Sequence, residues 1–163
     1  MEDLLVKLIN LVSQMMPELE VVDEDYGQIE MLEQENQDTY PLTFPAVLIN
    51  AADVAWSNAG NLSQKGLVTV RVRLALDCYD DTQAGSGTTE LIKARMKKVH
   101  KLHKLLQGLS IEGCSELIRT TSHYYTASHG IKVYENTYTC TVSENVNDVL
   151  ETTMVRPRIT AQR

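Results

Sequence analysis

The sequence predicts an α+β protein, in which a mostly antiparallel sheet of about four strands packs against an N-terminal helix and a central helix. Apolar and polar residues alternate through 67–79, which is the pattern of a long strand with one buried face. Between 88 and 107 the apolar repeat changes to that of a helix. Segments 117–128 and 131–143 are rich in Thr, Tyr and Val and predict a hairpin that turns at His129-Gly130. These three observations place one helix across an antiparallel sheet.

The first fifty residues add a helix and a strand. Apolar residues keep helical spacing from Leu4 to Met16, and Pro17 should end this helix because proline cannot continue the hydrogen-bond ladder. Residues 46–50 form a short apolar run after Pro45 and predict a buried strand. Two short apolar runs at 19–22 and 28–32 suggest a small hairpin within an acidic stretch.

The remaining segments connect these elements. Residues 51–65 have no clear period and are expected to form a loop or an extended hairpin arm. The Gly-rich stretch 80–89 reads as a flexible link into the central helix, and Gly108 stands where a C-cap glycine belongs. The helix face that should pack on the sheet carries Leu91, Ile92, Met96, Val99, Leu102, His103, Leu105 and Leu106.

A chain of 163 residues fits one domain with a sizeable core. We expect a single α+β domain over 1–150, interrupted by an acidic excursion at 18–40, and an extended basic C-terminal arm over 151–163. No internal repeat is visible. No apolar run approaches the ~20 residues that a membrane helix needs, and the acidic start Met1-Glu2-Asp3 is unlike a secretory signal. These features predict a soluble intracellular protein.

The three cysteines are widely spaced and odd in number. Cys78, Cys114 and Cys140 form no CxxC pair, so reduced thiols are favoured over a disulfide or a metal site.

Acidic residues are concentrated in one segment. The net charge is −7, and nine acids with no base lie between Glu18 and Asp38. The segment reads either as a solvated, mobile excursion or as a surface that repels DNA or docks on a basic partner. Its candidate interface residues are Glu18, Glu20, Asp23, Glu24, Asp25, Glu30, Glu33 and Glu35.

Basic residues gather on the central helix and in the tail. Lysines at spacings of four, four and three form one helical stripe, and arginines flank Pro157 near the C-terminus. The stripe reads as a solvated face, a contact for an acidic protein, or a contact for nucleic acid. The candidate interface residues are Lys93, Lys97, Lys101, Lys104, Arg156 and Arg158.

Residues that could carry chemistry do not assemble into a motif. His100 and His103 are three apart on a helix, but no Cys or carboxylate joins them at a useful spacing for a metal. The stretch 85–89 lacks the lysine of a phosphate-binding loop. Ser122 and His123 are adjacent on a strand, so their side chains point to opposite faces. We therefore expect no enzyme activity, no cofactor and no metal.

The order of elements resembles a known family. An N-terminal helix precedes the strand Phe-Pro-Ala-Val-Leu-Ile, and a Gly-led alternating strand leads to a helix that ends in Leu-Leu-Gln-Gly-Leu. A strand with Leu-Ile-Arg and a final strand rich in Val and Tyr complete the series. This order, over about 1–145, resembles the tail terminator, or tail completion, proteins of long-tailed bacteriophages, the group of the lambda minor tail protein U. The acidic segment and the arginine tail are departures from the family pattern.

The resemblance implies a non-enzymatic structural protein of a phage or prophage. Such a protein forms a ring, commonly a hexamer, that caps the tail tube, ends tail polymerisation and joins the tail to the head. Its implied partners are further copies of itself, the tail tube protein and the head connector protein. DNA passes through the lumen without specific binding, and no membrane is involved. The implied location is the virion, assembled in the bacterial host cytoplasm.

Other readings remain open. The chain could be another head–tail connector or a tube-like virion component. It could also be a small cytosolic α+β enzyme or ligand-binding protein, or a nucleic-acid-binding module.

Overall fold

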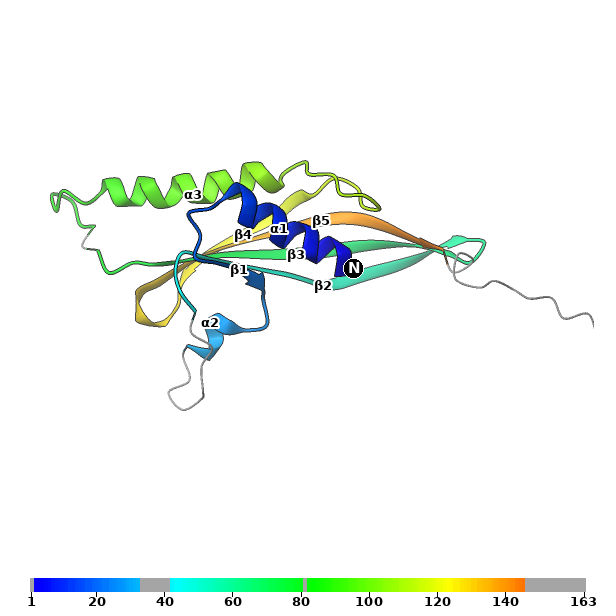
Figure 1. The fold of residues 1–163 in the computed structure, drawn as a ribbon, viewed down its shortest axis with the longest axis horizontal. Helices are drawn as coiled ribbons and strands as arrows, with labels where there is room; N and C mark the ends of the chain where they lie inside the picture. Colours follow the sequence, from blue (N-terminus) through cyan, green and yellow to red (C-terminus); the bar gives the residue numbers. More distant parts are fainter. Residues whose placement is uncertain (1, 33–41, 81, 146–163) are drawn as a thin grey trace, which may run out of the picture.

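The α+β fold predicted from the sequence is confirmed. The computed structural model describes residues 2–32, 42–80 and 82–145. In these residues the elements are α1 (Glu2–Met15), β1 (Val21–Glu24), α2 (Gln28–Met31), β2 (Ala46–Gly60), β3 (Ser63–Asp77), α3 (Glu90–Leu106), β4 (Ile118–Thr126), a 3₁₀ turn (Ser128–Gly130) and β5 (Ile131–Asn145). Helices α1 and α3 lie on one face of the sheet, and the short α2 lies on the other (Figure 1).

Within the described residues the sheet has five strands in the order β1-β2-β3-β5-β4. All neighbours are antiparallel except β1, whose four residues pair parallel with the start of β2. The predicted hairpin at His129-Gly130 is confirmed, since β4 and β5 are joined there by the 3₁₀ turn. The predicted C-cap glycine, Gly108, has a φ of 75°, in the left-handed region that glycine tolerates.

The main core lies between the sheet and the two longer helices. Leu8 and Val12 of α1 and Leu102 of α3 are fully or almost fully buried against Val70 and Tyr138 of the sheet. Helical and strand periodicities meet here as the sequence predicts, so burial of these apolar side chains is the main source of stability.

A second, smaller core lies on the opposite face of the sheet. Its buried members are Ile29, Leu42, Ala46, Leu48, Ala75, Ile131 and Val133. The expectation that β3 has only one buried face is therefore wrong at its C-terminal half, where Arg73 and Ala75 are buried as well as Leu74 and Leu76. The reason is that α2 and the residues around it cover this end of the second face.

Two local expectations need correction, and for segment 51–65 one of the two alternatives is confirmed. In the described part of the acidic stretch, residues 18–32, there is no hairpin, because β1 pairs with β2 and residues Gln28–Met31 form a helix instead. Segment 51–65 is not a loop, and its alternative reading as an extended hairpin arm is confirmed. The first turn of α3 is not packed on the sheet, since Leu91 and Ile92 remain exposed.

The ends of β2, β3 and β5 form a three-stranded arm that extends beyond the helices (Figure 1). Within the arm, Gly66 of β3 lies opposite Trp56 of β2 and Val142 of β5. A Cβ atom at Gly66 would lie 2.6 Å from Val54 Cγ1 and 2.9 Å from the Trp56 ring. The indole therefore covers the glycine, which is a known way of stabilising a strand glycine.

Some expectations concern residues outside the described ranges. Glu33, Glu35, Arg156 and Arg158 belong to this group, as does the whole basic arm at 151–163. The division into a domain over 1–150 and an arm stays a prediction.

Candidate interface surfaces

The sheet has unpaired backbone at both of its edges. On one side β4 pairs only with β5 among the described strands, so no strand pairs with its outer edge, although the Arg119 N–H near its start donates to Gln107 Oε1. On the other side β1 covers only Ala46–Ile49 of β2, which leaves the β2 edge unpaired from Asp53 to Gly60 within the described chain. An unpaired edge presents backbone N–H and C=O groups that another strand can bind.

The β4 edge has only two of the features that usually protect an edge strand, the charge of Arg119 and a register irregularity between Arg119 and Thr121. Its sequence Ile-Arg-Thr-Thr-Ser-His-Tyr-Tyr-Thr has no proline, no lysine and no acid, and most of its residues are exposed. Thr, Tyr and Ile also favour the strand conformation. Because free edges of soluble proteins are normally short, charged or covered, this edge is a good candidate for pairing with another chain.

The acidic and basic candidates partly neutralise each other within the subunit. Lys101 Nζ donates hydrogen bonds of 2.8 and 3.0 Å to the two carboxylate oxygens of Glu18. The hydrogen bond from Lys101 lowers the pKa of Glu18 below its ordinary value. Lys93 likewise pairs with Glu90 at 2.7 Å on its own helix. Lys97 and Lys104 are exposed and make no ion pair with a described residue, so they remain available to a partner.

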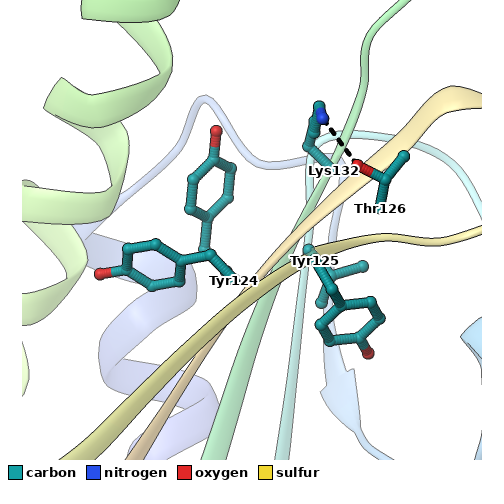
Figure 2. Close-up of a pocket in the computed structure, with 6 residues that line it drawn as sticks. Tyr124, Tyr125, Thr126 and Lys132 are labelled. Carbon is teal, nitrogen blue, oxygen red and sulfur yellow. Dashed lines mark hydrogen bonds between the residues drawn. The ribbon is translucent and has the colours of Figure 1, made fainter.

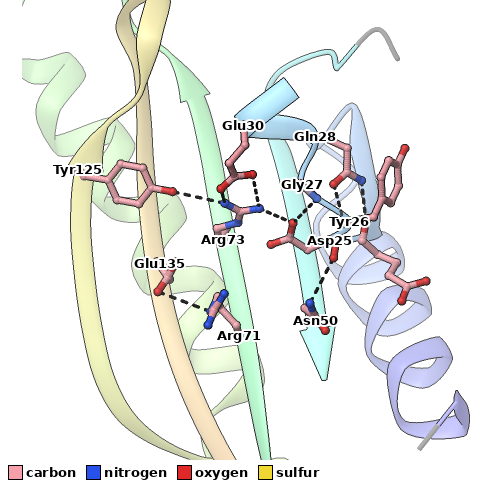
Figure 3. Close-up of polar contacts among 11 residues, drawn as sticks. Asp25, Tyr26, Gly27, Gln28, Glu30, Asn50, Arg71, Arg73, Tyr125 and Glu135 are labelled. Atoms are coloured by element: carbon pink, nitrogen blue, oxygen red, sulfur yellow. Dashed lines mark hydrogen bonds and ion pairs between the residues drawn. The ribbon is translucent and has the colours of Figure 1, made fainter. Parts of the chain in front are cut away.

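Two of the acidic candidates serve a structural role that the sequence did not reveal. Arg73 of β3 reaches Asp25 and Glu30, and its Nη1 donates a 3.5 Å hydrogen bond to Tyr125 Oη (Figure 3). The Asp25 side chain is 5% exposed and that of Arg73 is 6% exposed. Asp25 is therefore a buried partner of Arg73 and not a residue of a solvated acidic surface, which corrects the sequence-based expectation.

The Arg73 cluster attaches α2 to the sheet. Burial alone would lower the pKa of Arg73, but the hydrogen bonds to Glu30 and Asp25 outweigh it and raise that pKa. The same guanidinium lowers the pKa of Glu30. Asp25 also accepts a 3.1 Å hydrogen bond from the Gly27 backbone N–H, and Asn50 Nδ2 donates to the Asp25 carbonyl. The remaining exposed acids of the described segment are Glu18, Glu20 and Glu24, with Asp23 half-buried.

His103 and Cys140 occupy packing positions, whereas His100, His123 and His129 are exposed. His103 Nδ1 lies 3.1 Å from Tyr138 Oη, beneath α3. Burial, followed by the charges of Arg119 and His100, lowers the pKa of His103, and burial raises the pKa of Tyr138 to about 12. The three cysteines are free thiols, and Cys140 is buried. The described residues contain no cluster of three or more His, Cys, Asp or Glu that could hold a metal ion.

A small pocket lies where β4 and β5 approach their turn. It has a volume of about 200 Å³, and Tyr124 and Tyr125 lie on opposite faces of the sheet beside it (Figure 2). Tyr124 makes an edge-to-face contact with Tyr134, with ring centroids 5.1 Å apart. Lys132 Nζ donates a 2.6 Å hydrogen bond to Thr126 Oγ1. The pocket therefore offers aromatic surface and one lysine that already has a partner.

Comparisons with known proteins give little further guidance. No protein-family model matches the chain, and no curated protein matches it. Among solved structures it is similar to a chain in a structure described as the virion of a native gene transfer agent (GTA) particle. The TM-score is 0.44 at 13% identity, over 74% of this chain and 87% of that chain. A similarity of this size supports no argument about function. No helix in the described ranges has the length and apolar character needed to cross a membrane.

Proposed function

We propose that this chain is a structural component of a phage-like virion that assembles into a ring and ends the growth of a tail tube. The observation that carries the ring is the pair of open edges at β4 and at β2 from Asp53 to Gly60, on opposite sides of one sheet. The role in a tail comes from the resemblance of element order to tail terminator proteins.

The two edges suit a head-to-tail contact. If an edge pairs with the same edge of another copy, assembly ends at a dimer. If two different edges on opposite sides of a subunit pair with each other, each copy can bind the next. Such contacts close into a ring if the rotation between subunits divides a full turn. The twist of the sheet supplies a rotation between successive subunits, and the resemblance favours six of them.

The charge distribution fits passage of DNA without binding. The exposed acids Glu20, just before β1, and Glu24, its last residue, give this edge of the sheet negative charge, whereas Glu18 is paired with Lys101. Like charge repels a phosphate backbone, so acids that face a lumen would keep DNA from adhering. We propose that these acids face the lumen and that Lys97 and Lys104 on the outer helix remain for a protein partner.

The function is structural and not enzymatic in this proposal. The polar groups that come together in the described residues, such as Arg73 with Asp25 and His103 with Tyr138, connect secondary-structure elements to each other. Such contacts hold a scaffold whose exposed edges and faces carry the contacts with other subunits.

Electron microscopy of the concentrated protein tests the proposal. We expect rings with a central hole, and in the presence of tail tubes from the same particle we expect a ring at one tube end and a fixed tube length. Rings that stack into tubes would favour a tube-like virion component instead. Isolated single subunits at every concentration, with tubes that continue to grow, would contradict the proposal.

A further inference from the structure

The arm ends in an exposed leucine, Leu62, within a tight turn. Gly60 pairs with Ser63 at the tip, which leaves Asn61 and Leu62 as a two-residue turn. Their φ angles are 50° and 59°, so both residues are in the left-handed region. Leu62 is 67% exposed.

This turn is unfavourable for leucine. Two-residue hairpin turns with positive φ at both positions prefer Asn followed by Gly, because a residue with a Cβ atom is strained there. Asn61 fits the first position, but Leu62 is both strained and exposed to water. A bulky apolar residue in such a conformation at the end of a protruding arm is typical of a contact with a partner rather than of hairpin stability.

A cavity of suitable chemistry lies at the other end of the molecule. It has a volume of about 170 Å³ and lies between the first turns of α3 and the end of β3. Its apolar lining comes from Pro45, Leu76, Leu91 and Ala94, and Cys78 also lines it. Leu91 is 37% exposed, in the first turn of α3, which does not pack on the sheet. The cavity therefore explains why this end of the helix is apolar although the sheet does not cover it.

We propose that the arm tip of one subunit inserts Leu62 into this cavity of the next subunit. The inference rests on the proposed ring and names a contact in it beyond the sheet edges. The tip and the cavity lie at opposite ends of the long axis of the fold, so the contact joins two different surfaces of neighbouring copies (Figure 1). A repeated contact of this kind is compatible with a closed ring.

Charged residues of both signs flank the arm tip and line the cavity. Lys65 and Glu144 are exposed on the arm, and the cavity lining also includes Asp77, Asp80 and Lys98. Arg95, whose side chain is 14% exposed, also lines the cavity; its Nη1 is 3.9 Å from Asp80, and its Nε has no hydrogen-bond partner among the described atoms. Opposite charges on the two surfaces would orient the arm, while burial of Leu62 would supply most of the affinity.

The native thiol of Cys78 allows a direct test. Leu62→Cys places a thiol at the arm tip, and mild oxidation of the assembled protein should link it to Cys78 of another copy. Peptide mass spectrometry should identify the 62–78 pair, and the variant that also carries Cys78→Ser should lose the link. A link between two arm tips, or to Cys114 alone, would contradict the proposal.

Leu62→Gly separates association from folding. Glycine relieves the strain of the turn, so the urea midpoint of the dissociated subunit should stay the same or rise. Self-association measured by sedimentation should weaken at least about tenfold, the loss expected when a buried leucine side chain is removed. Ala94→Trp changes the other partner of the contact, because it fills the cavity that would receive Leu62. It should weaken association in the same way.

The outcomes distinguish this inference from the ring itself. If the wild-type protein forms rings and Leu62→Gly forms them equally well, the arm contact is wrong and the ring stands. If no ring forms but the 62–78 link appears in a dimer, the arm contact stands and the ring is wrong. If neither rings nor the link form, both are wrong.

Discussion

Arg73 and Asp25, 48 positions apart in the sequence, form a buried ion pair that fastens the segment around α2 to the second face of the sheet. Glu30 and Tyr125 complete the partners of the guanidinium. The pair lies over the smaller core, where the sheet is covered on both faces. This contact determines how the described part of the acidic segment is held.

Replacing Arg73 by Met should destabilise the fold strongly. The substitution leaves the Asp25 carboxylate buried without a cation, a loss of about 3–5 kcal/mol in typical proteins. Urea unfolding measures it as a lower transition midpoint. Arg71→Met is the matched control. Arg71 lies two positions before Arg73 in β3, its side chain is 49% exposed, and its Nε is 3.8 Å from Glu135 Oε1. That control should cost less than about 1 kcal/mol. Equal losses in both variants would refute the structural role of the buried pair.

Gly66→Ala should destabilise the arm. The added Cβ would lie 2.6 Å from Val54 Cγ1 and 2.9 Å from the Trp56 ring, so strands β2 and β3 must shift. Overpacking of this kind costs about 1–3 kcal/mol, and hydrogen exchange should become faster in the arm than in the helix-covered sheet. Lys65→Ala, at the neighbouring exposed position, serves as the control. Unchanged exchange in Gly66→Ala would mean that the indole does not pack on the glycine.

The stability should depend on the protonation of His103 in mildly acidic solution. Its folded pKa lies below the unfolded value of about 6.5, mainly because of burial. Between these two pKa values the unfolded chain binds more protons than the folded one, so stability falls as pH is lowered through this window. The difference in unfolding free energy between wild type and His103→Gln should therefore change between pH 7.5 and pH 5.5. A difference that does not change with pH would contradict the shift.

The three thiols should react at different rates. Cys140 is 3% exposed, and burial, aided by Cys114, raises its pKa to about 11. At pH 8 only about one molecule in a thousand would carry its thiolate, the reactive form. Iodoacetamide should modify Cys78 and Cys114 well before Cys140, and all three at similar rates in concentrated urea. Rapid modification of Cys140 in the folded protein would show that this part of the core opens readily.

The sequence predicted the elements whose periodicity extends over many residues. The apolar alternation in β3 and the apolar stripe of α3 that ends at Leu106 both face the main core. Such patterns can be recognised from neighbouring residues in the sequence alone. Arg73 could not be interpreted in the same way, because it occupies the polar side of that alternation. Its burial results from α2, which packs there through contacts between residues far apart in the chain.

The candidate interface was predicted only in part. Charge runs drew attention to Glu18 and Lys101, yet these two residues pair within the subunit and leave little for a partner. The open edge of β4 was not foreseen as a specific surface, since strand order in a sheet depends on pairing that local pattern does not encode. The absence of lysine, proline and acids from 118–126 is the signal that could have indicated it.

Two edge variants test most directly whether subunits join through opposite edges of the sheet. Thr121→Lys places a charge on β4, and Ala55→Lys places one on the exposed edge of β2. Thr137→Lys, at the position paired with Thr121 but inside the sheet, is the control for charge alone. Each edge variant by itself should stay monomeric under conditions in which the wild type and Thr137→Lys form rings.

The decisive measurement is the mass in solution of an equal mixture of the two edge variants. Each retains the edge that the other lacks, so the account predicts a heterodimer that grows no further. Rings in the mixture, rings of either variant alone, or no association in the mixture while the wild type forms rings would contradict the account.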